Sequence, residues 1–312
     1  NRIIWDLCEK VIDTRIPCEE YNQLSIAIIE NNDRRSRIKK KINFITHSSL
    51  KEQKYFKTKR IVLAAHLGIG DMFTMTGAIR YYSICYDRVI IFCKGYNYST
   101  VQKLFQDDPT IQIDIVGYNE RKDDTDGYKE MAALLNGKYN NSDYKIVRCG
   151  FVIPGNDNFD KHEFYNHFYK DINLDPSIRY KYFHITRDLV HEKYIFDNTV
   201  GKVKKYIFTH DKGNSPFEEY FKDKDICIYH PSRNYYSEGH KYYHVWNGYH
   251  ENIVSYATII ENASEIYVLD SSFYCLSTYL NLKATKRVVL DPKWHNIYNY
   301  PHENERNKWT IV

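Results

Sequence analysis

The sequence predicts an α/β protein with two facing domains, each a parallel sheet flanked by helices, and an N-terminal helical segment. From about residue 60, short apolar runs suited to buried strands alternate with stretches of helical periodicity. This alternation pauses in an aromatic stretch and restarts near residue 204. The length of 312 residues agrees with two domains at roughly 150 residues each.

The N-terminal segment, residues 1–59, is expected to be helical and to pack on the first domain. Apolar periodicity predicts helices over 3–11 and 19–30, separated by a break at Pro17. A basic run follows at 33–41, with six cations in nine residues. No aromatic residue interleaves this run, which favours a solvated linker or helix face. Contact with phosphates or anionic lipid is the alternative.

The first domain is expected over residues 60–200. Strands are predicted at 60–66, 88–93, 111–116 and 144–153, and helices at 72–82, 99–105 and 128–135. An aromatic and charged stretch from 158 to about 200 is predicted to be helical and to end this domain.

The second domain is expected over residues 201–312. Strands are predicted at 205–209, 225–229, 265–270 and 286–290, and helices at 251–262 and 271–281. Both halves are therefore predicted to be Rossmann-like, joined near residue 200 across a cleft. Ligands of such sheets bind beyond the carboxyl ends of the strands.

Composition and charge exclude several classes of protein. The net charge of +4 is too small to indicate nucleic-acid binding. The longest apolar runs fall far short of the roughly 18 residues of a membrane helix, so no transmembrane segment is expected. Seven cysteines without a CxxC pair argue against a disulfide framework or structural zinc, and a cytoplasmic location is expected. The chain begins at Asn1 without a signal peptide and is expected to be part of a longer protein.

The sharpest local feature is the turn Gly68-Ile69-Gly70-Asp71, between a predicted strand and a predicted helix. The two glycines allow the backbone to approach a ligand closely, and the start of the helix offers unpaired N–H groups. Asp71 is a candidate general base, because a carboxylate at the cleft edge can take a proton from a hydroxyl. Capping of the helix is the structural interpretation of the same residue.

A second feature lies at the corresponding place in the second half, where Asp270-Ser271-Ser272 joins a strand to a helix. Hydroxyls and free N–H groups at a helix start suit a phosphate. Neighbouring strand ends carry His210 with Lys212, and Arg233. Convergence of these strand ends would surround a diphosphate with positive charge.

These residues resemble the heptosyltransferase-like glycosyltransferases and, more widely, the two-domain GT-B enzymes. In that family a Gly-x-Gly-Asp turn carries the catalytic base, and Asp71 occupies the matching position. The family's donor-binding turn is similar to Asp270-Ser271-Ser272, and its phosphate-binding cation is most similar to Lys212. Phe273 stands near the place of a family histidine, and the Lys-x-Trp-Pro signature is missing, so the resemblance leaves the donor open.

The resemblance implies transfer of a sugar from a nucleoside diphosphate-sugar to a hydroxyl of a glycan or glycolipid. It implies inversion at the anomeric carbon without a metal ion or a bound cofactor, and a hexosyl- or deoxyhexosyl-type reaction is expected. The donor would contact Gly68, Gly70, His210, Lys212, Arg233, Asp270, Ser271 and Ser272.

Other interpretations stay open. An NADP-dependent oxidoreductase would use the first turn together with Lys94. A protein whose aromatic cleft only binds carbohydrate would need no base. The DxD patterns at 124–126 and 223–225 lie in polar loops, and the histidine pair at 240 and 244 has no third ligand, so none is favoured as a metal site. His66 is a rival base, although a histidine at a buried strand end is more often structural.

Overall fold

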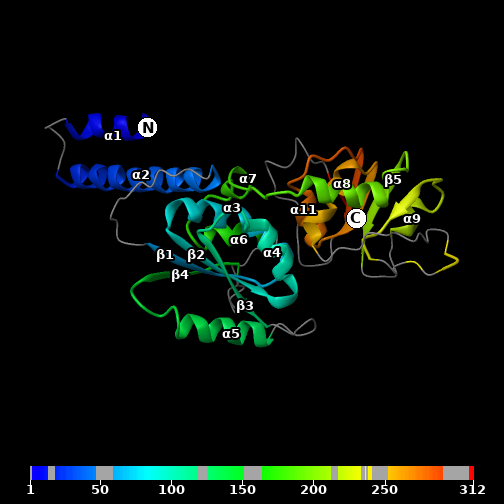
Figure 1. Cartoon of the computed structure of the whole chain (residues 1–312), viewed down its shortest axis with the longest axis horizontal. Coiled ribbons are helices and arrows are strands. Elements are labelled where there is room, and N and C mark those ends of the chain that lie inside the picture. The colour runs from blue at the N-terminus through cyan, green and yellow to red at the C-terminus, as the bar shows by residue number, and fades with distance from the viewer. Residues whose placement is uncertain are drawn as a thin grey trace.

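The computed structural model describes residues 2–12, 18–46, 59–117, 125–150, 164–211, 217–232, 236, 238–240, 252–290 and 309–312. Within these ranges the chain forms two separate parallel sheets surrounded by helices (Figure 1). The strand orders are β3-β2-β1-β4 and β6-β5-β7-β8-β9. Two parallel sheets in one α/β chain confirm the predicted fold class, and the GT-B arrangement stays a prediction.

The first sheet contains the four predicted strands, with β1 at its centre. Its strands are β1 (Arg60–Ala64), β2 (Arg88–Lys94), β3 (Ile111–Val116) and β4 (Tyr144–Arg148). Ile61 lies opposite Val89 on one side and Lys145 on the other. The buried run of β1 is apolar on both faces, as expected for a central parallel strand.

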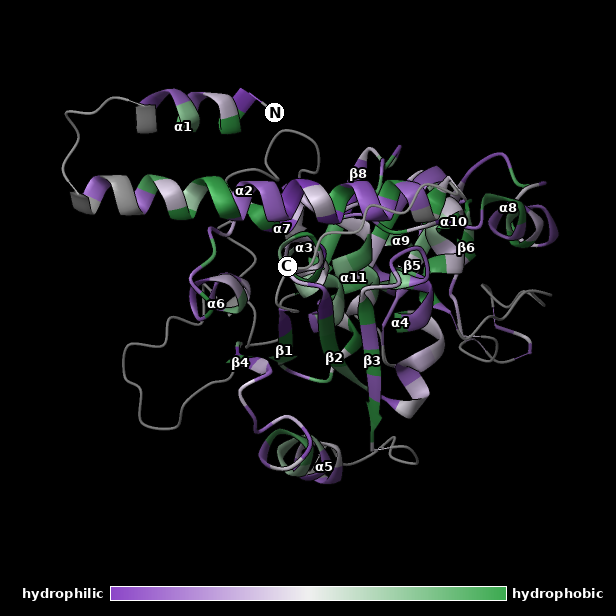
Figure 2. Ribbon diagram, turned by 60° about the vertical axis from the view of Figure 1, so that its left-hand side comes forward, coloured by the Kyte–Doolittle hydropathy of each residue, from purple (hydrophilic) through white to green (hydrophobic). Residues whose placement is uncertain are grey.

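Alternation along β1 divides the core of this half into two layers. Ile61 and Leu63 join the larger cluster, with side chains of α3 (Ile69–Cys85) and α4 (Tyr98–Phe105). Val62 and Ala64 face the opposite side, with side chains of α5 (Thr125–Asn136). Figure 2 shows α3 and α5 on opposite faces of the sheet. The short helix η1 (Gly95–Asn97) joins β2 to α4.

The second sheet contains the four predicted strands and one further short strand. Its strands are β5 (Tyr206–His210), β6 (Cys227–Tyr229), β7 (Glu265–Leu269), β8 (Lys286–Leu290) and β9 (Thr310–Ile311). The surrounding helices are α9 (Glu218–Phe221), η3 (Ile253–Tyr256), α10 (Ala257–Asn262) and α11 (Ser272–Ser277). Helix α11 is therefore shorter than the predicted 271–281. Its cap residue Thr278 bonds back to the Tyr274 carbonyl at 3.1 Å.

The N-terminal segment forms α1 (Arg2–Ile12) and α2 (Cys18–Ile45). Helix α2 continues through the basic run instead of ending near residue 30, and packs against α3. The basic run is a helix face with carboxylate partners: Arg37 lies 3.5 Å from Asp87, and Lys41 pairs with Asp108. Residues 33–41 are therefore part of helix α2 and do not form a linker.

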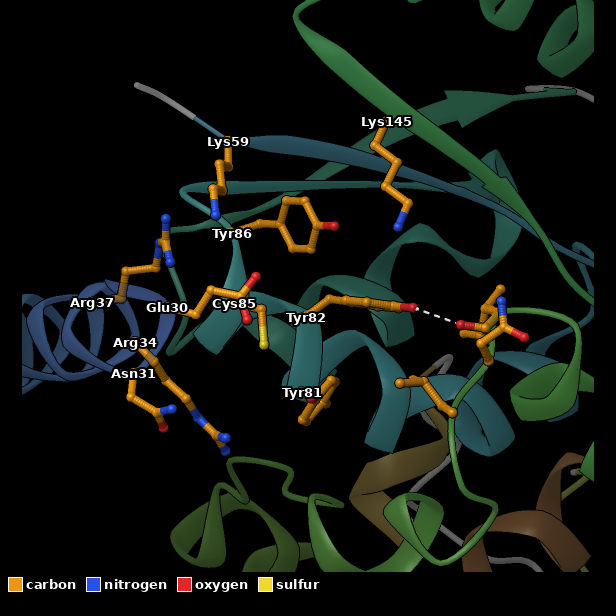
Figure 3. Close-up of a pocket in the computed structure, with 13 residues that line it drawn as sticks. Glu30, Asn31, Arg34, Arg37, Lys59, Tyr81, Tyr82, Cys85, Tyr86 and Lys145 are labelled. Atoms are coloured by element: carbon orange, nitrogen blue, oxygen red, sulfur yellow. Dashed lines mark hydrogen bonds between the residues drawn. The ribbon is translucent and has the colours of Figure 1, made fainter. Parts of the chain in front are cut away.

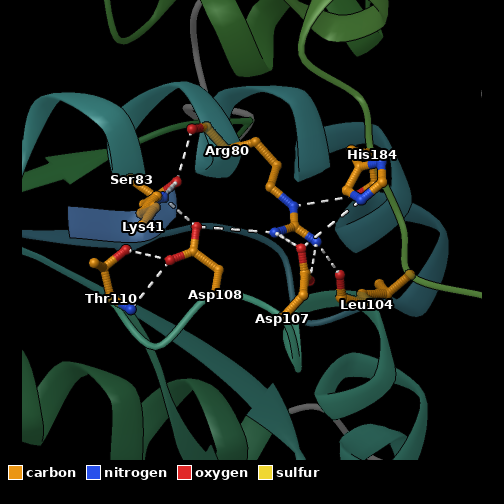
Figure 4. A network of polar contacts seen from close by, with 8 residues as sticks. All are labelled: Lys41, Arg80, Ser83, Leu104, Asp107, Asp108, Thr110 and His184. Carbon is orange, nitrogen blue, oxygen red and sulfur yellow. Dashed lines mark hydrogen bonds and ion pairs between the residues drawn. The ribbon is translucent and has the colours of Figure 1, made fainter. Parts of the chain in front are cut away.

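Helices α2 and α3 meet the start of β3 through a polar network (Figure 4). Lys41 donates to the Ser83 hydroxyl at 2.8 Å and to Asp108. On the next turn of α3, Arg80 makes a bidentate bond to Asp107 at 2.7 and 3.0 Å. Bidentate guanidinium–carboxylate pairs are among the stronger polar contacts, so Arg80 fixes α3 to the residues before β3. Lys41 attaches α2 to the same place.

The chain crosses between the halves through α6 (Phe164–Lys170), α7 (Ile178–Lys181) and the stretch before α8 (Leu189–Asn198). Arg80 holds this stretch on one side, donating from Nε to the His184 carbonyl at 3.1 Å. Arg187 holds it on the other, with bonds to Glu192 and Glu261. Helix α8 packs on η3 and α10. The proposed domain boundary at residue 200 stays a prediction.

Among the described helices, none has both the length and the apolar composition required to cross a membrane.

Candidate active site

Asp71 lies in the first turn of α3, directly beyond the carboxyl end of β1. Gly68 is the N-cap residue of α3 and has an extended backbone. Because glycine has no side chain, no side-chain capping hydrogen bond is made at this position. A Cβ placed on Gly68 would lie 2.5 Å from Oδ2 of Asp71. The carboxylate therefore folds back over residue 68, and only glycine leaves that space open.

The surroundings of Asp71 raise its pKa from 3.8 to about 7, mainly through burial. The charge of Asp270, from the second half, raises the pKa further, and Lys94 lowers it. Lys94 ends β2 and is only 3% exposed. A carboxylate with a pKa near 7 can accept a proton at neutral pH and release it again, which suits a general base.

The two halves meet where α3 and α11 begin. A Cβ on Gly70 would lie 3.4 Å from the Cys275 sulfur and 3.6 Å from the backbone nitrogen of Ser272. Gly70 thus allows close packing of the first turns of these two helices. The structure brings Gly70, Asp71, Asp270 and Ser272 together at this junction.

Asp270 follows β7 and is held by a residue that sequence reasoning missed. The Tyr165 hydroxyl, from α6, donates to Oδ1 of Asp270 at 2.9 Å. Tyr165 stands in a stretch with many aromatic residues, and no spacing in the sequence singles it out.

A buried cation, also missed, lies behind Tyr165. Arg179 of α7 is 2% exposed, and its guanidinium lies 4.9 Å from the centre of the Tyr165 ring. Its Nε donates to the Tyr279 hydroxyl at 2.7 Å, across the junction of the halves. Cation–π contacts of this kind are stronger when desolvated. Gly77 makes room for α7, because a Cβ there would lie 2.5 Å from the Arg179 carbonyl.

Cys275 also lies at this junction. Burial raises the pKa of its thiol to about 12, and Asp270 adds to the shift while Arg179 opposes it. The thiol therefore stays protonated at neutral pH. A protonated thiol is a poor nucleophile, so Cys275 serves packing between α3 and α11.

The strand ends of the second half bring His210 and Ser271 together. The Ser271 hydroxyl lies 3.2 Å from Nδ1 of His210 and makes no capping bond to α11. The His210 ring packs on Phe273 at 4.5 Å and on His230 at 5.6 Å between centroids. Burial lowers the pKa of His230 to about 4, so its imidazole is neutral at pH 7. Lys212 and Arg233 lie outside the described residues.

His66, the rival base, is packed between two rings. Its Nδ1 lies 3.0 Å from the Tyr128 hydroxyl, and the Phe168 ring centre lies 6.2 Å from its own. Burial lowers the pKa of His66. These contacts favour a structural role.

The alternative metal motifs lie partly outside the described residues, which include neither Asp124 nor His244. Between the acidic residues of the 223–225 motif, Lys224 pairs with Glu265. In the part of the chain that the structure describes, no three His, Cys, Asp or Glu side chains cluster closely enough to hold a metal ion.

No family model and no curated protein matches this chain. Solved structures of similar fold include the glycosyl transferase family 9 protein from Veillonella parvula DSM 2008. That likeness has a TM-score of 0.51 and 10% identity, and covers 81% of this chain and 85% of that one.

The dodecameric iron-containing glycosyltransferase TibC from enterotoxigenic E. coli H10407 matches at a TM-score of 0.45 and 14% identity, over 79% of this chain. A structure of TibC as a heptosyltransferase with ADP-D-beta-D-heptose matches at 0.43 and 13% identity. This chain spans 64% of TibC in both cases. The chain thus shares its arrangement of sheets and helices with the Veillonella glycosyl transferase.

Proposed function

We propose that this protein is a glycosyltransferase that moves a sugar from a nucleoside diphosphate-sugar to a hydroxyl of a glycan or glycolipid. One observation carries the proposal: where α3 packs against α11, Asp71 has a pKa of about 7 and lies close enough to Asp270 of the other half for that charge to act on it. The fold shared with the family 9 structure supports the same class of reaction. We expect the GT-B arrangement, the domain boundary near 200 and a cytoplasmic location.

The first half is proposed to present the acceptor to Asp71. Its ionised carboxylate accepts the proton of the acceptor hydroxyl while the oxygen attacks the anomeric carbon. The bond from that carbon to the diphosphate breaks with its electron pair leaving on the phosphate oxygen. Because attack and departure occur on opposite faces of the sugar, the configuration inverts. The charge of Lys94 lowers the pKa of Asp71 and so increases the fraction of the ionised carboxylate at neutral pH.

The second half is proposed to hold the donor. His210, Ser271 and Ser272 lie at its strand ends, and Asp270 is proposed to contact the sugar. Lys212 and Arg233 are proposed to carry the charge of the departing diphosphate, a role that needs neither a metal nor a bound cofactor. Gly68 and Gly70 are also proposed to border the donor, although the space beside them holds the Asp71 carboxylate and the Cys275 sulfur.

The proposed oxidoreductase alternative assigns Lys94 to an NADP phosphate. The observed position of Lys94, buried and acting on the pKa of Asp71, favours the transferase instead.

The experiment compares the wild type with Asp71→Asn on a panel of nucleotide sugars. Donor binding, measured by thermal shift, should survive in the variant, because Asp71 belongs to the other half. Transfer to a mixed glycan acceptor should fall by about 10²–10⁴-fold, the usual contribution of a general base. Asp126→Asn, on the exposed face of α5, is the matched control and should transfer normally. Equal turnover by Asp71→Asn would reject the base, and absence of binding to every donor would reject the transferase.

A further inference from the structure

A pocket lies between α2 and the carboxyl-terminal end of α3. It is a cavity of about 420 Å³, bounded by the starts of β1 and β4 and by the turn after α6. Figure 3 shows side chains reaching into this region from α2, from α3 and from the strand side. We call it the α2–α3 pocket. It is lined by Glu30, Asn31, Arg34, Arg37, Lys59, Tyr81, Tyr82, Cys85, Tyr86, Lys145, Ile172, Asn173 and Leu174.

The lining is strongly cationic: Arg34, Arg37, Lys59 and Lys145 face a single carboxylate, Glu30. Arg37 is engaged by Asp87 at 3.5 Å. Arg34 has neutral contacts instead, donating to the Tyr182 hydroxyl at 2.8 Å and lying 5.6 Å above the Tyr81 ring.

Lys145 sits on the edge strand of the first sheet with its side chain exposed. Within the described ranges, no carboxylate lies at ion-pair distance from Lys145 or Arg34. Lys59 lies 4.0 Å from Asp33, at the outer limit of an ion pair. The pocket therefore holds positive charge that the described part of the protein does not neutralise.

Three tyrosines at the carboxyl-terminal end of α3 form the opposite wall: Tyr81 and Tyr82 in its last turns and Tyr86 at its cap. Their rings meet edge to face, Tyr81 with Tyr82 at 5.7 Å and Tyr82 with Tyr86 at 5.6 Å. Tyr82 is fixed by its hydroxyl, which donates to the Ile172 carbonyl at 3.2 Å. Tyr81 and Tyr86 are partly exposed. Ordered, partly exposed tyrosines offer an apolar face and a polar tip to one ligand.

The α2–α3 pocket is separate from the candidate active site. Cys85 lies fourteen positions after Asp71 in α3, which places the two residues about 20 Å apart along the helix at 1.5 Å per residue. Lys59 precedes β1, whereas Asp71 follows it, so the two sites lie at opposite ends of the strands of the first sheet.

We propose that the α2–α3 pocket binds an anionic saccharide, with the anionic group on Arg34, Lys59 and Lys145 and the sugar ring against Tyr81 and Tyr86. The cations determine the charge of the ligand, and the tyrosines favour a ring that carries hydroxyls. The choice of a saccharide over another ringed anion rests on the proposed function. A phosphate ester and a carboxylate share the required chemistry.

The test is calorimetric titration without any nucleotide sugar, so that it needs no transferase activity. Glucose 6-phosphate and glucuronate are the anionic sugar probes. Glucose has only the sugar ring, and inorganic phosphate has only the anionic group, so these two are the controls. At least one anionic sugar should bind with a Kd of about 1 mM or tighter. Glucose and phosphate alone should each bind about tenfold more weakly or worse. The better anionic sugar identifies the preferred charged group.

Charge reversal by Lys145→Glu should weaken binding at least about tenfold, because it replaces attraction with repulsion. Lys129→Glu reverses the charge of another exposed lysine, on α5, and should not weaken binding. Ser272→Glu, with negative charge at the proposed donor site, should also bind normally, provided its melting temperature is unchanged. Failure of both anionic sugars, equal binding of phosphate alone, or equal binding by Lys145→Glu would overturn the proposal. Loss of anionic-sugar binding in Ser272→Glu alone would assign that binding to the donor site, and it too would overturn the proposal for the α2–α3 pocket. A failed transfer assay with intact sugar binding would reject the proposed function alone.

Discussion

The hydroxyl of Tyr165 donates a 2.9 Å hydrogen bond to Asp270, which joins α6 to the end of β7. The two residues are 105 positions apart in the sequence, and their contact links the aromatic middle stretch to the second sheet. Through Asp270 this contact also bears on Asp71, whose pKa depends on the charge of Asp270. The hydrogen bond therefore connects the packing of the two halves to the chemistry proposed for their junction.

Tyr165→Phe removes this bond without changing the volume of the ring. Because Tyr165 is 6% exposed, Asp270 loses a donor that water replaces poorly. We expect a loss of about 1–3 kcal/mol in the free energy of unfolding, measured by urea titration. The exposed Tyr194→Phe is the control and should lose none. A Tyr165→Phe variant as stable as the wild type would show that the bond contributes nothing.

The pH dependence of transfer should follow ionisation of Asp71. Only the carboxylate accepts a proton, so kcat/KM should rise as the pH passes about 7. Asp270→Asn removes a repulsive charge, lowers the pKa of Asp71 and should move the rise to lower pH. Lys94→Met removes an attractive charge and should move it to higher pH. Profiles that coincide in all three proteins would contradict the assignment of Asp71.

Stability should also depend on pH through Asp71. Its carboxyl ionises near 3.8 when unfolded and near 7 when folded. Between these values the unfolded state binds fewer protons at this site, so the wild type loses stability as the pH rises. The full effect is about 1.4 kcal/mol per unit of pKa difference. Asp71→Asn removes this dependence, and its advantage in melting temperature should grow from pH 4 to 7 and then level off.

Gly68→Ala should separate activity from stability. The new methyl group would occupy the place of Oδ2 of Asp71, and the flexible carboxylate would move away. Misplacement of a catalytic group by about 1 Å can lower the rate about 100-fold. The backbone of Gly68, at φ −71° and ψ 144°, accepts alanine, so the variant should be as stable as the wild type. Gly70→Ala is the comparison variant, because its new methyl group would lie 3.4 Å from the Cys275 sulfur instead of against the Asp71 carboxylate. Full activity of Gly68→Ala would argue against Asp71 as the base.

Arg187→Met should destabilise the second half. Glu192 is 1% exposed and accepts bonds from Arg187 at 2.5 and 3.0 Å. A buried carboxylate without its cation costs about 3 kcal/mol or more, measured by thermal denaturation. Lys193→Met breaks the exposed pair with Asp197 and should change stability by less than about 1 kcal/mol. Similar losses in the two variants would show that burial does not set the strength of the Arg187 pair.

Much of the fold could be predicted because strands and helices reflect local patterns. The runs at 111–116 and 286–290 match β3 and β8 at both ends, since each is a short apolar-rich run bounded by turn residues. The continuation of α2 through the basic run could not be predicted, because it depends on carboxylates of other segments, such as Asp108. For the same reason, nothing near Tyr165 or Arg179 in the sequence shows what their side chains contact.

The sequence by itself determined two parallel sheets, and it placed Asp71 and Asp270 each at the start of a helix. Strand alternation and glycine-containing turns act over a few residues, so they can be read without coordinates. Only the tertiary structure decided that Asp270 and Lys94 act on the pKa of Asp71, and that a cationic pocket lies at the far end of α3. Burial and charge interactions depend on distances between segments far apart in the chain, and only folding sets those distances.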